Sequence, residues 1–324
     1  MQVYRHSGAT PLIGAVKALL AGSLAAIGLG VVYCFSFYYV PYVYLNFVMA
    51  VCVGAGAGYV VGQTAIHGKI RNVNAVGGIA LLAALAGIYA EWGTTIYALY
   101  PAAELPQFFA KAGLKPFLPQ NIVVLMAELF ARGSWGLAAN AMVTGWPLVA
   151  LWLVEAGLIL AAAVGAATLR IADRPFCERC QEWVGGLTPH VYVGDGTEPV
   201  WTEVQRGIFE SLALTPRADG TEPTYVKLTL RVCDGCSESN YLTITTCRKY
   251  VDGHGHQQLQ QRDLIKNLIL TSTQVEIVQA ANIIAPSALE VPLALSPSAG
   301  NWTMQDSTRA TAPIAPPTPA NARS

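Results

Sequence analysis

The chain has 324 residues, of which 53% are hydrophobic and 12% are charged, and its formal net charge at pH 7 is zero. A soluble domain carries roughly 25% charged residues, so this composition excludes an ordinary soluble globular protein. Residues 171–324 hold 12 Lys and Arg against 16 Asp and Glu. This acidic excess argues against a nucleic-acid partner, because binding phosphates requires a basic face.

The first long apolar segment lacks charge from Ala18 to Ile66. A single helix of this length would extend about 74 Å, more than twice the roughly 30 Å hydrocarbon core of a bilayer. Pro41 lies among several tyrosines and marks a break, because proline disrupts helices and tyrosine favours the lipid–water interface. The segment therefore predicts two membrane spans, at residues 12–39 and 42–66.

Two further apolar segments predict spans at residues 75–97 and 146–169, which makes residues 1–170 a transmembrane domain with a four-helix bundle. Between them, residues 120–132 predict a helix that either lies flat at the interface or enters the bilayer as a re-entrant segment. The positive-inside rule then predicts that both termini lie in the cytoplasm. The expected location of this multi-pass protein is a bacterial inner membrane. The cytoplasmic side would carry six Lys and Arg (Arg5, Lys17, Lys69, Arg71, Arg170, Arg174), and the opposite side three (Lys111, Lys115, Arg132).

Two features inside the predicted spans are candidates for function. Gly54, Gly58 and Gly62 are spaced four apart and share one helix face, which favours close helix packing within the bundle or a homo-oligomer contact. Glu155 lies near the middle of the fourth span, where an isolated charge is costly. It is expected to be a neutral carboxyl that bonds a neighbouring helix, or part of a proton or ion path. No second ionisable residue is expected at that depth, since Glu91 is expected to reach water at the outer interface.

The next segment contains two Cys-x-x-Cys pairs, Cys177/Cys180 and Cys233/Cys236, separated by 52 residues. Two such turns can supply four sulfurs in a tetrahedron, which is the closed arrangement typical of structural zinc, with iron as the alternative. Four cysteines leave no open position on the metal, so hydrolytic metal chemistry is disfavoured. Free thiols also fit the reducing cytoplasm.

The elements around these pairs predict a small zinc-ribbon-like α+β domain at residues 171–284. Strands are expected near residues 190–193 and at 225–232 and 240–251, and an amphipathic helix near 203–214. Residues 263–270 could form a strand or begin a helix, and 273–284 predict a short helix. Residues 285–324, rich in Pro, Ala, Ser and Thr, predict a disordered tail.

These features favour a membrane protein that presents a structural-zinc cytoplasmic module to a protein partner, for recruitment or scaffolding. The alternative is a small transporter or channel component that uses Glu155 within the membrane. An enzyme at the membrane surface is the least favoured class, because the sequence shows no Ser/His/Asp set, phosphate-binding loop or catalytic carboxylate pair.

Overall fold

The computed structural model describes residues 2–39, 43–99, 111, 113–138, 141–187, 191–194, 198–213, 222–236, 238–253 and 256–280. The predicted tail at 285–324 lies outside these residues.

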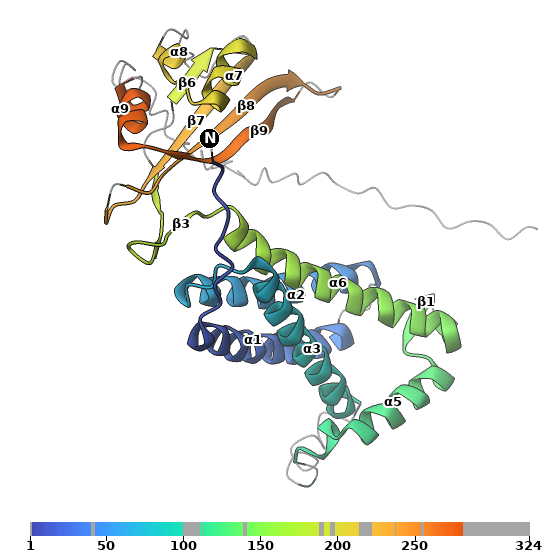
Figure 1. Ribbon diagram of the computed structural model, residues 1–324. Helices are drawn as coiled ribbons and strands as arrows, with labels where there is room; N and C mark the ends of the chain where they lie inside the picture. The colour runs from blue at the N-terminus through green and yellow to red at the C-terminus, as the bar shows by residue number, and fades with distance from the viewer. Residues whose placement is uncertain are drawn as a thin grey trace, which may run out of the picture. The chain divides into compact units, whose positions relative to one another are not determined.

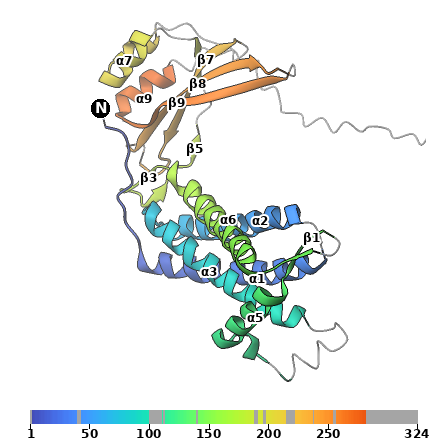
Figure 2. The same ribbon diagram turned by 90° about the vertical axis from the view of Figure 1, so that its right-hand side faces the viewer.

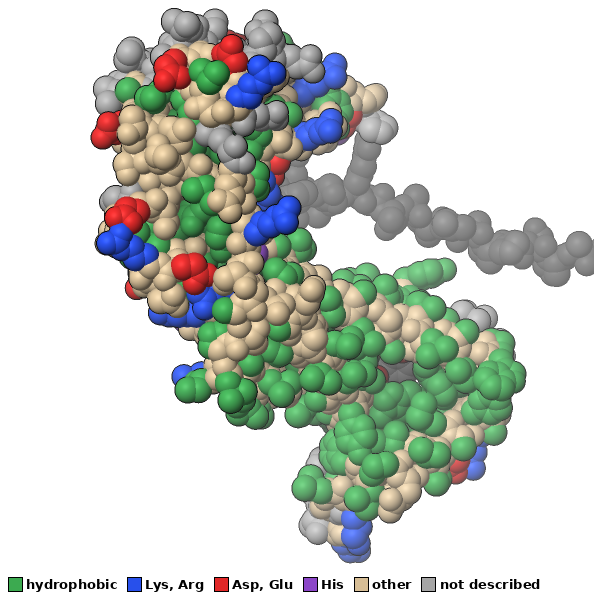
Figure 3. Space-filling view, viewed as in Figure 1, with side chains coloured by type: hydrophobic (Ala, Val, Ile, Leu, Met, Phe, Trp, Pro, Cys, Tyr) green, Lys and Arg blue, Asp and Glu red, His purple; other side chains and the backbone are tan. Residues whose placement is uncertain are grey.

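Four helices are long and apolar enough to cross a membrane: α1 (Leu12–Tyr39), α2 (Val43–His67), α3 (Val73–Ala98) and α6 (Gly145–Ala172). Their ends fall within three residues of the predicted spans. The helix α1 packs against α2 and α3, and α6 packs against α2 and α3 (Figure 1). Hydrophobic side chains make up much of the face of this bundle that Figure 3 shows, as contact with a bilayer would require.

The glycine row of α2 lies against α6 of the same chain. A Cβ atom at Gly54 would collide with the carbonyl oxygen of Ile159, and one at Gly58 with the carbonyl oxygen of Ala163. At Gly62 the added atom would lie 3.0 Å from the side chain of Arg170. The small residues therefore let two helix backbones approach within the bundle, and α6 already covers this face.

Between α3 and α6, the chain forms the 3-10 helix η1 (Lys115–Phe117), the helix α5 (Pro119–Arg132) and a hairpin of β1 (Trp135–Ala138) and β2 (Ala141–Val143). The predicted helix at 120–132 is thus present, and the hairpin after it was not predicted. α5 buries Ile122 and Leu125 and exposes Val123 and Val124 at more than 60% of their surface.

After α6, the chain forms an antiparallel sheet. Its strands pair in the order β5 (Gly186–Leu187), β7 (Thr224–Val232), β8 (Asn240–Val251) and β9 (Gln257–Leu270), and β6 (Val191–Gly194) also pairs with β7. The strand predicted near 190–193 corresponds to β6, although residue 190 lies outside the described residues. Residues 263–270 belong to β9, so the strand interpretation of that segment is confirmed.

Three helices pack on one face of this sheet: α7 (Glu198–Arg206), α8 (Glu210–Ala213) and α9 (Ser272–Ala280). Figure 2 shows α7 and α9 beside the strands β7 to β9. The predicted single helix at 203–214 is wrong, because the chain breaks at Gly207, whose φ of +99° suits glycine and ends α7. The core between helices and sheet includes Trp201, Phe209, Leu228, Leu242, Ile244, Leu270 and Val278.

The N-terminal segment joins the edge of this sheet. Val3 forms an antiparallel bridge with Leu268, Tyr4 N–H donates to the Asn267 carbonyl at 2.9 Å, and Ile269 N–H donates to the Gln2 carbonyl at 3.1 Å. Residues before the first helix therefore hydrogen-bond with the last strand, an arrangement that no local sequence pattern predicted.

Candidate metal centre

The first cysteine pair lies on a short hairpin directly after α6. The two-residue strands β3 (Phe176–Cys177) and β4 (Glu182–Trp183) pair antiparallel. Between them, Cys180 N–H contacts the Cys177 sulfur at 3.4 Å, and Gln181 takes the left-handed conformation with φ of +56°. The turn thus directs both thiols to the same side of the hairpin.

The second pair lies at the end of β7, where Cys233 N–H donates to the Ser239 carbonyl at 3.2 Å. Gly235 lies between the two cysteines, and a Cβ atom there would be 2.8 Å from the sulfur of Cys180. Glycine is therefore required for the two turns to approach each other, a role that the spacing of the cysteines alone did not reveal.

The structure brings the four predicted thiols together. The sulfurs of Cys177, Cys180, Cys233 and Cys236 all lie within 4.8 Å of one another, and those of Cys177 and Cys236 are 3.6 Å apart. In a tetrahedral site with metal–sulfur distances of about 2.3 Å, the sulfurs would be about 3.8 Å apart. The donor set and its spacing fit such a site, so the cluster could hold a metal ion.

The environment favours thiolates at two of the four positions. The backbone N–H of Glu238 lowers the pKa of Cys236 to about 6. Burial raises the pKa of Cys177, but hydrogen bonds with Ser239 and the Cys180 N–H outweigh this effect, and the net shift is downward. The contact with Cys236 raises the pKa of Cys180 to about 12, and burial raises that of Cys233. A bound cation would displace the remaining protons.

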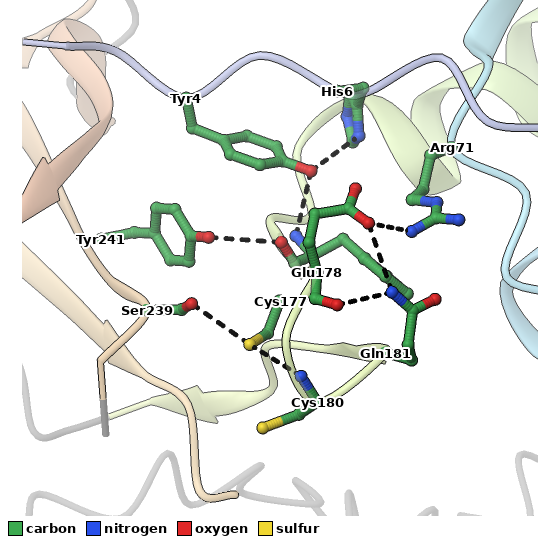
Figure 4. A network of polar contacts seen from close by, with 10 residues as sticks. Tyr4, His6, Arg71, Cys177, Glu178, Cys180, Gln181, Ser239 and Tyr241 are labelled. Atoms are coloured by element: carbon green, nitrogen blue, oxygen red, sulfur yellow. Dashed lines mark hydrogen bonds and ion pairs between the residues drawn. The ribbon is translucent and has the colours of Figure 1, made fainter. Parts of the chain in front are cut away.

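Neighbouring polar groups hold the cluster in place, as Figure 4 shows. The Ser239 hydroxyl oxygen lies 3.1 Å from the sulfur of Cys177, and the Tyr241 hydroxyl donates to the Phe176 carbonyl at 3.2 Å. Cys177 and Cys233 are buried, whereas Cys180 and Cys236 are partly exposed. The exposed pair leaves a route by which an ion could reach the sulfurs.

The second candidate, Glu155 of α6, is 8% exposed within the bundle. Its carboxylate accepts a hydrogen bond from the hydroxyl of Tyr33 in α1, which also lies 3.3 Å from the carbonyl oxygen of Asn46 in α2. Glu91 of α3 interacts electrostatically with Glu155, and it lines a small cavity with Tyr33 and Ile159. The prediction that Glu155 has no ionisable neighbour is therefore wrong.

Sequence reasoning missed this arrangement because it depends on the rotation of four helices about their axes. Glu91 was placed at the outer interface by its distance from the end of the span, which takes no account of the direction of its side chain. Tyr33 could not be recognised as the partner of Glu155, because it lies in an apolar segment that contains several other tyrosines.

The chain matches no known protein-family model, and no curated protein or solved structure shows significant similarity to it.

Proposed function

We propose that this protein crosses the membrane four times and presents a zinc-stabilised cytoplasmic domain to a protein partner. The single observation that carries the proposal is the cluster of four sulfurs, all within 4.8 Å of one another. Four thiolates complete a tetrahedral site and leave no position for a substrate, so the metal has a structural role. In such a role the metal fixes the fold of the domain, and the surface of the folded domain is what a partner would bind.

Zinc and the cytoplasmic side are supported by separate arguments. Tetrahedral sulfur sites suit zinc or iron, and two short turns of the Cys-x-x-Cys type resemble those of zinc ribbons. All seven cysteines are free thiols, as the cytoplasm favours. The excess of Lys and Arg on the same side of the predicted spans agrees with that placement.

Exposed apolar side chains on β8 and β9 support the part of the proposal that concerns a protein partner. Tyr250, Val251 and Leu259 are 49%, 64% and 46% exposed there, and Leu264 of the same strand is 43% exposed. None of these four side chains belongs to the described core between the sheet and the helices α7, α8 and α9. Exposed apolar side chains of this kind, here on the end of β8 and on the edge strand β9, are typical of a surface that another protein buries.

Crosslinking in cells followed by mass spectrometry tests this function. Cells producing the intact protein are compared with cells producing Cys233→Ser, which cannot complete the sulfur cluster, and Leu259→Asp, which alters only the exposed hairpin. We expect the same partner to crosslink to the intact protein and to be reduced on the order of tenfold in both variants. Undiminished capture by Cys233→Ser would contradict the proposal. The control is Glu128→Asp, an exposed change in α5.

The second candidate function is proton or cation movement through the bundle. The observation that favours it is that Tyr33 and Glu91 line one small cavity, while Glu155 accepts a hydrogen bond from Tyr33 and interacts electrostatically with Glu91. Ionisable side chains within membrane spans are costly to bury, and proton and ion paths are among the functions for which they are retained.

For this candidate, Glu155→Gln is expected to abolish proton or monovalent-cation flux in vesicles that contain the purified protein, since glutamine keeps the hydrogen bond from Tyr33 but cannot ionise. A fluorescent pH or potential indicator inside the vesicles gives the measurement. Glu128→Gln on the exposed surface of α5 is the matched control and should transport as the unchanged protein does. Equal flux in both variants would exclude the carboxylate from the path.

A further inference from the structure

The first cysteine turn contacts the sulfur cluster on one side and the end of the membrane bundle on the other. Cys177 supplies a sulfur to the cluster, while its neighbours Phe176 and Glu178 contact Arg71 in the loop between α2 and α3. Trp183, at the other end of the same hairpin, contacts the last turn of α2. We call the contacts of Phe176, Glu178 and Trp183 with Ile66 and Arg71 the junction.

Arg71 is the centre of the junction. Only 7% of its surface is exposed, and its guanidinium forms an ion pair with Glu178 (Figure 4). The guanidinium also lies 4.3 Å from the centre of the Phe176 ring. Its backbone N–H donates to the Ala9 carbonyl at 2.8 Å, so the position of the loop is fixed from both sides. In the part of the chain that the structure describes, Glu178 is the carboxylate paired with this guanidinium.

The two side chains of this ion pair are buried to different extents, so Arg71 relies on Glu178 to neutralise its buried charge. The Arg71 side chain is 8% exposed and that of Glu178 is 50% exposed. A buried charge that loses its partner is strongly destabilising, whereas a half-exposed carboxylate can be hydrated again. Displacement of Glu178 would therefore act mainly on the loop between α2 and α3.

Trp183 adds an uncharged contact to the junction. Its indole N–H donates at 2.8 Å to the Ile66 carbonyl in the last turn of α2, which also accepts from the Lys69 N–H at 3.0 Å. Its ring packs on a core cluster of the bundle that includes Ala65, Ile70, Val76 and Ile171. The hairpin that carries two sulfurs thus also covers the end of three membrane helices.

We propose that metal binding at the four cysteines fixes the junction, so that the end of the bundle at α2 and α3 is ordered only when the metal is bound. This inference rests on the metal centre proposed above. Glu178 directly follows Cys177 and lies two residues before Cys180, so two metal–sulfur bonds would fix the backbone that positions its carboxylate. Without the metal, the two-residue ladder of β3 and β4 is too short to hold that turn by itself.

Hydrogen exchange measured by mass spectrometry tests the coupling in the full chain, embedded in lipid nanodiscs. Protein loaded with Zn²⁺ is compared with protein treated with a chelator, and the readout is a peptide that covers residues 65–76. We expect the amides of this peptide to exchange at least about tenfold more slowly in the zinc-loaded protein. A peptide from the middle of α2, residues 50–60, should exchange equally in both states.

Glu178→Ala separates the coupling from metal binding. This variant should still bind one zinc ion per chain, because all four cysteines remain, yet residues 65–76 should exchange about as fast as in the metal-free protein. Its matched control is Glu182→Ala, which removes an exposed carboxylate from the same hairpin and should keep the zinc-dependent protection. Trp183→Phe, which loses the bond to Ile66, should bind zinc and keep only part of the protection.

Two results would overturn the inference in different ways. If the intact protein binds zinc but residues 65–76 exchange at the same rate with and without it, the metal centre stands and the coupling is wrong. If the intact protein binds no zinc, the metal centre and the coupling both fail. Unchanged protection in zinc-loaded Glu178→Ala would also refute the role assigned to the ion pair.

Discussion

Cys233→Ser is expected to abolish metal binding and to unfold the sheet domain while the membrane helices remain inserted. Cys233 is 4% exposed, lies where β7 ends, and packs with Cys177, Val184 and Tyr241. A serine oxygen is a poor substitute for a thiolate, and structural zinc contributes on the order of 10 kcal/mol to the folding of small zinc domains. That contribution is as large as the entire stability of a typical domain, about 5–15 kcal/mol.

Metal content and trypsin digestion of the purified protein measure this result. The intact protein should carry one metal ion and resist cleavage within β7 to β9, where Lys227, Arg231 and Lys266 lie in paired strands. The variant should carry none and be cut there rapidly, while α1, α2, α3 and α6 stay protected by lipid or detergent.

Cys247→Ser is the matched control, because Cys247 is a fully buried thiol of the neighbouring strand that lies outside the cluster. Because this variant buries a hydroxyl, its free energy of unfolding should fall by about 1–3 kcal/mol, and it should still bind the metal. A Cys233→Ser protein that is folded and free of metal would show that the hydrophobic core between sheet and helices suffices for folding.

The second large effect is expected at Gly58, in the contact between α2 and α6. A methyl group at this position would collide with the carbonyl oxygen of Ala163, so Gly58→Ala must move two helix backbones apart. Overpacking of this kind costs about 1–3 kcal/mol, and more where backbone rather than a flexible side chain obstructs the new group. The loss of stability should appear as a lower detergent concentration at the midpoint of unfolding, when the protein in micelles is unfolded with a denaturing detergent.

Gly157→Ala in α6 provides the comparison, because no atom lies within 4 Å of a Cβ atom added there. Both substitutions raise helix propensity equally, so any difference between them reports the helix contact. The control should be as stable as the unchanged protein or slightly more so. Equal midpoints for the two variants would mean that α2 and α6 do not pack through Gly58.

The features that could be predicted from sequence are those encoded in neighbouring residues. An uncharged segment from Ala18 to Ile66 is too long for one span, and the thiols of each Cys-x-x-Cys pair are brought close by a single turn. β7 and β8 were predicted because β-branched and alternating residues identify strands locally.

The features that sequence reasoning missed join residues far apart in the chain. Arg71 and Glu178 are 107 positions apart, and Tyr33 and Glu155 are 122 positions apart. Neither pair has a local signal, because each depends on how the helices rotate and where the loops end. Arg71 was counted only as one of several basic residues in a loop, although the structure buries it.

The bridge between Val3 and Leu268 has a consequence for the synthesis of this protein, since 265 positions separate its two residues. A ribosome that adds about 5–20 residues per second needs about 15–50 s to make the intervening chain. During that time the N-terminal segment has no strand to pair with, and all four apolar helices are synthesised before β9 exists. The edge of the sheet can close only after β9 has been synthesised, so chains that stop before Leu270 would leave their N-terminal residues open to proteases and chaperones.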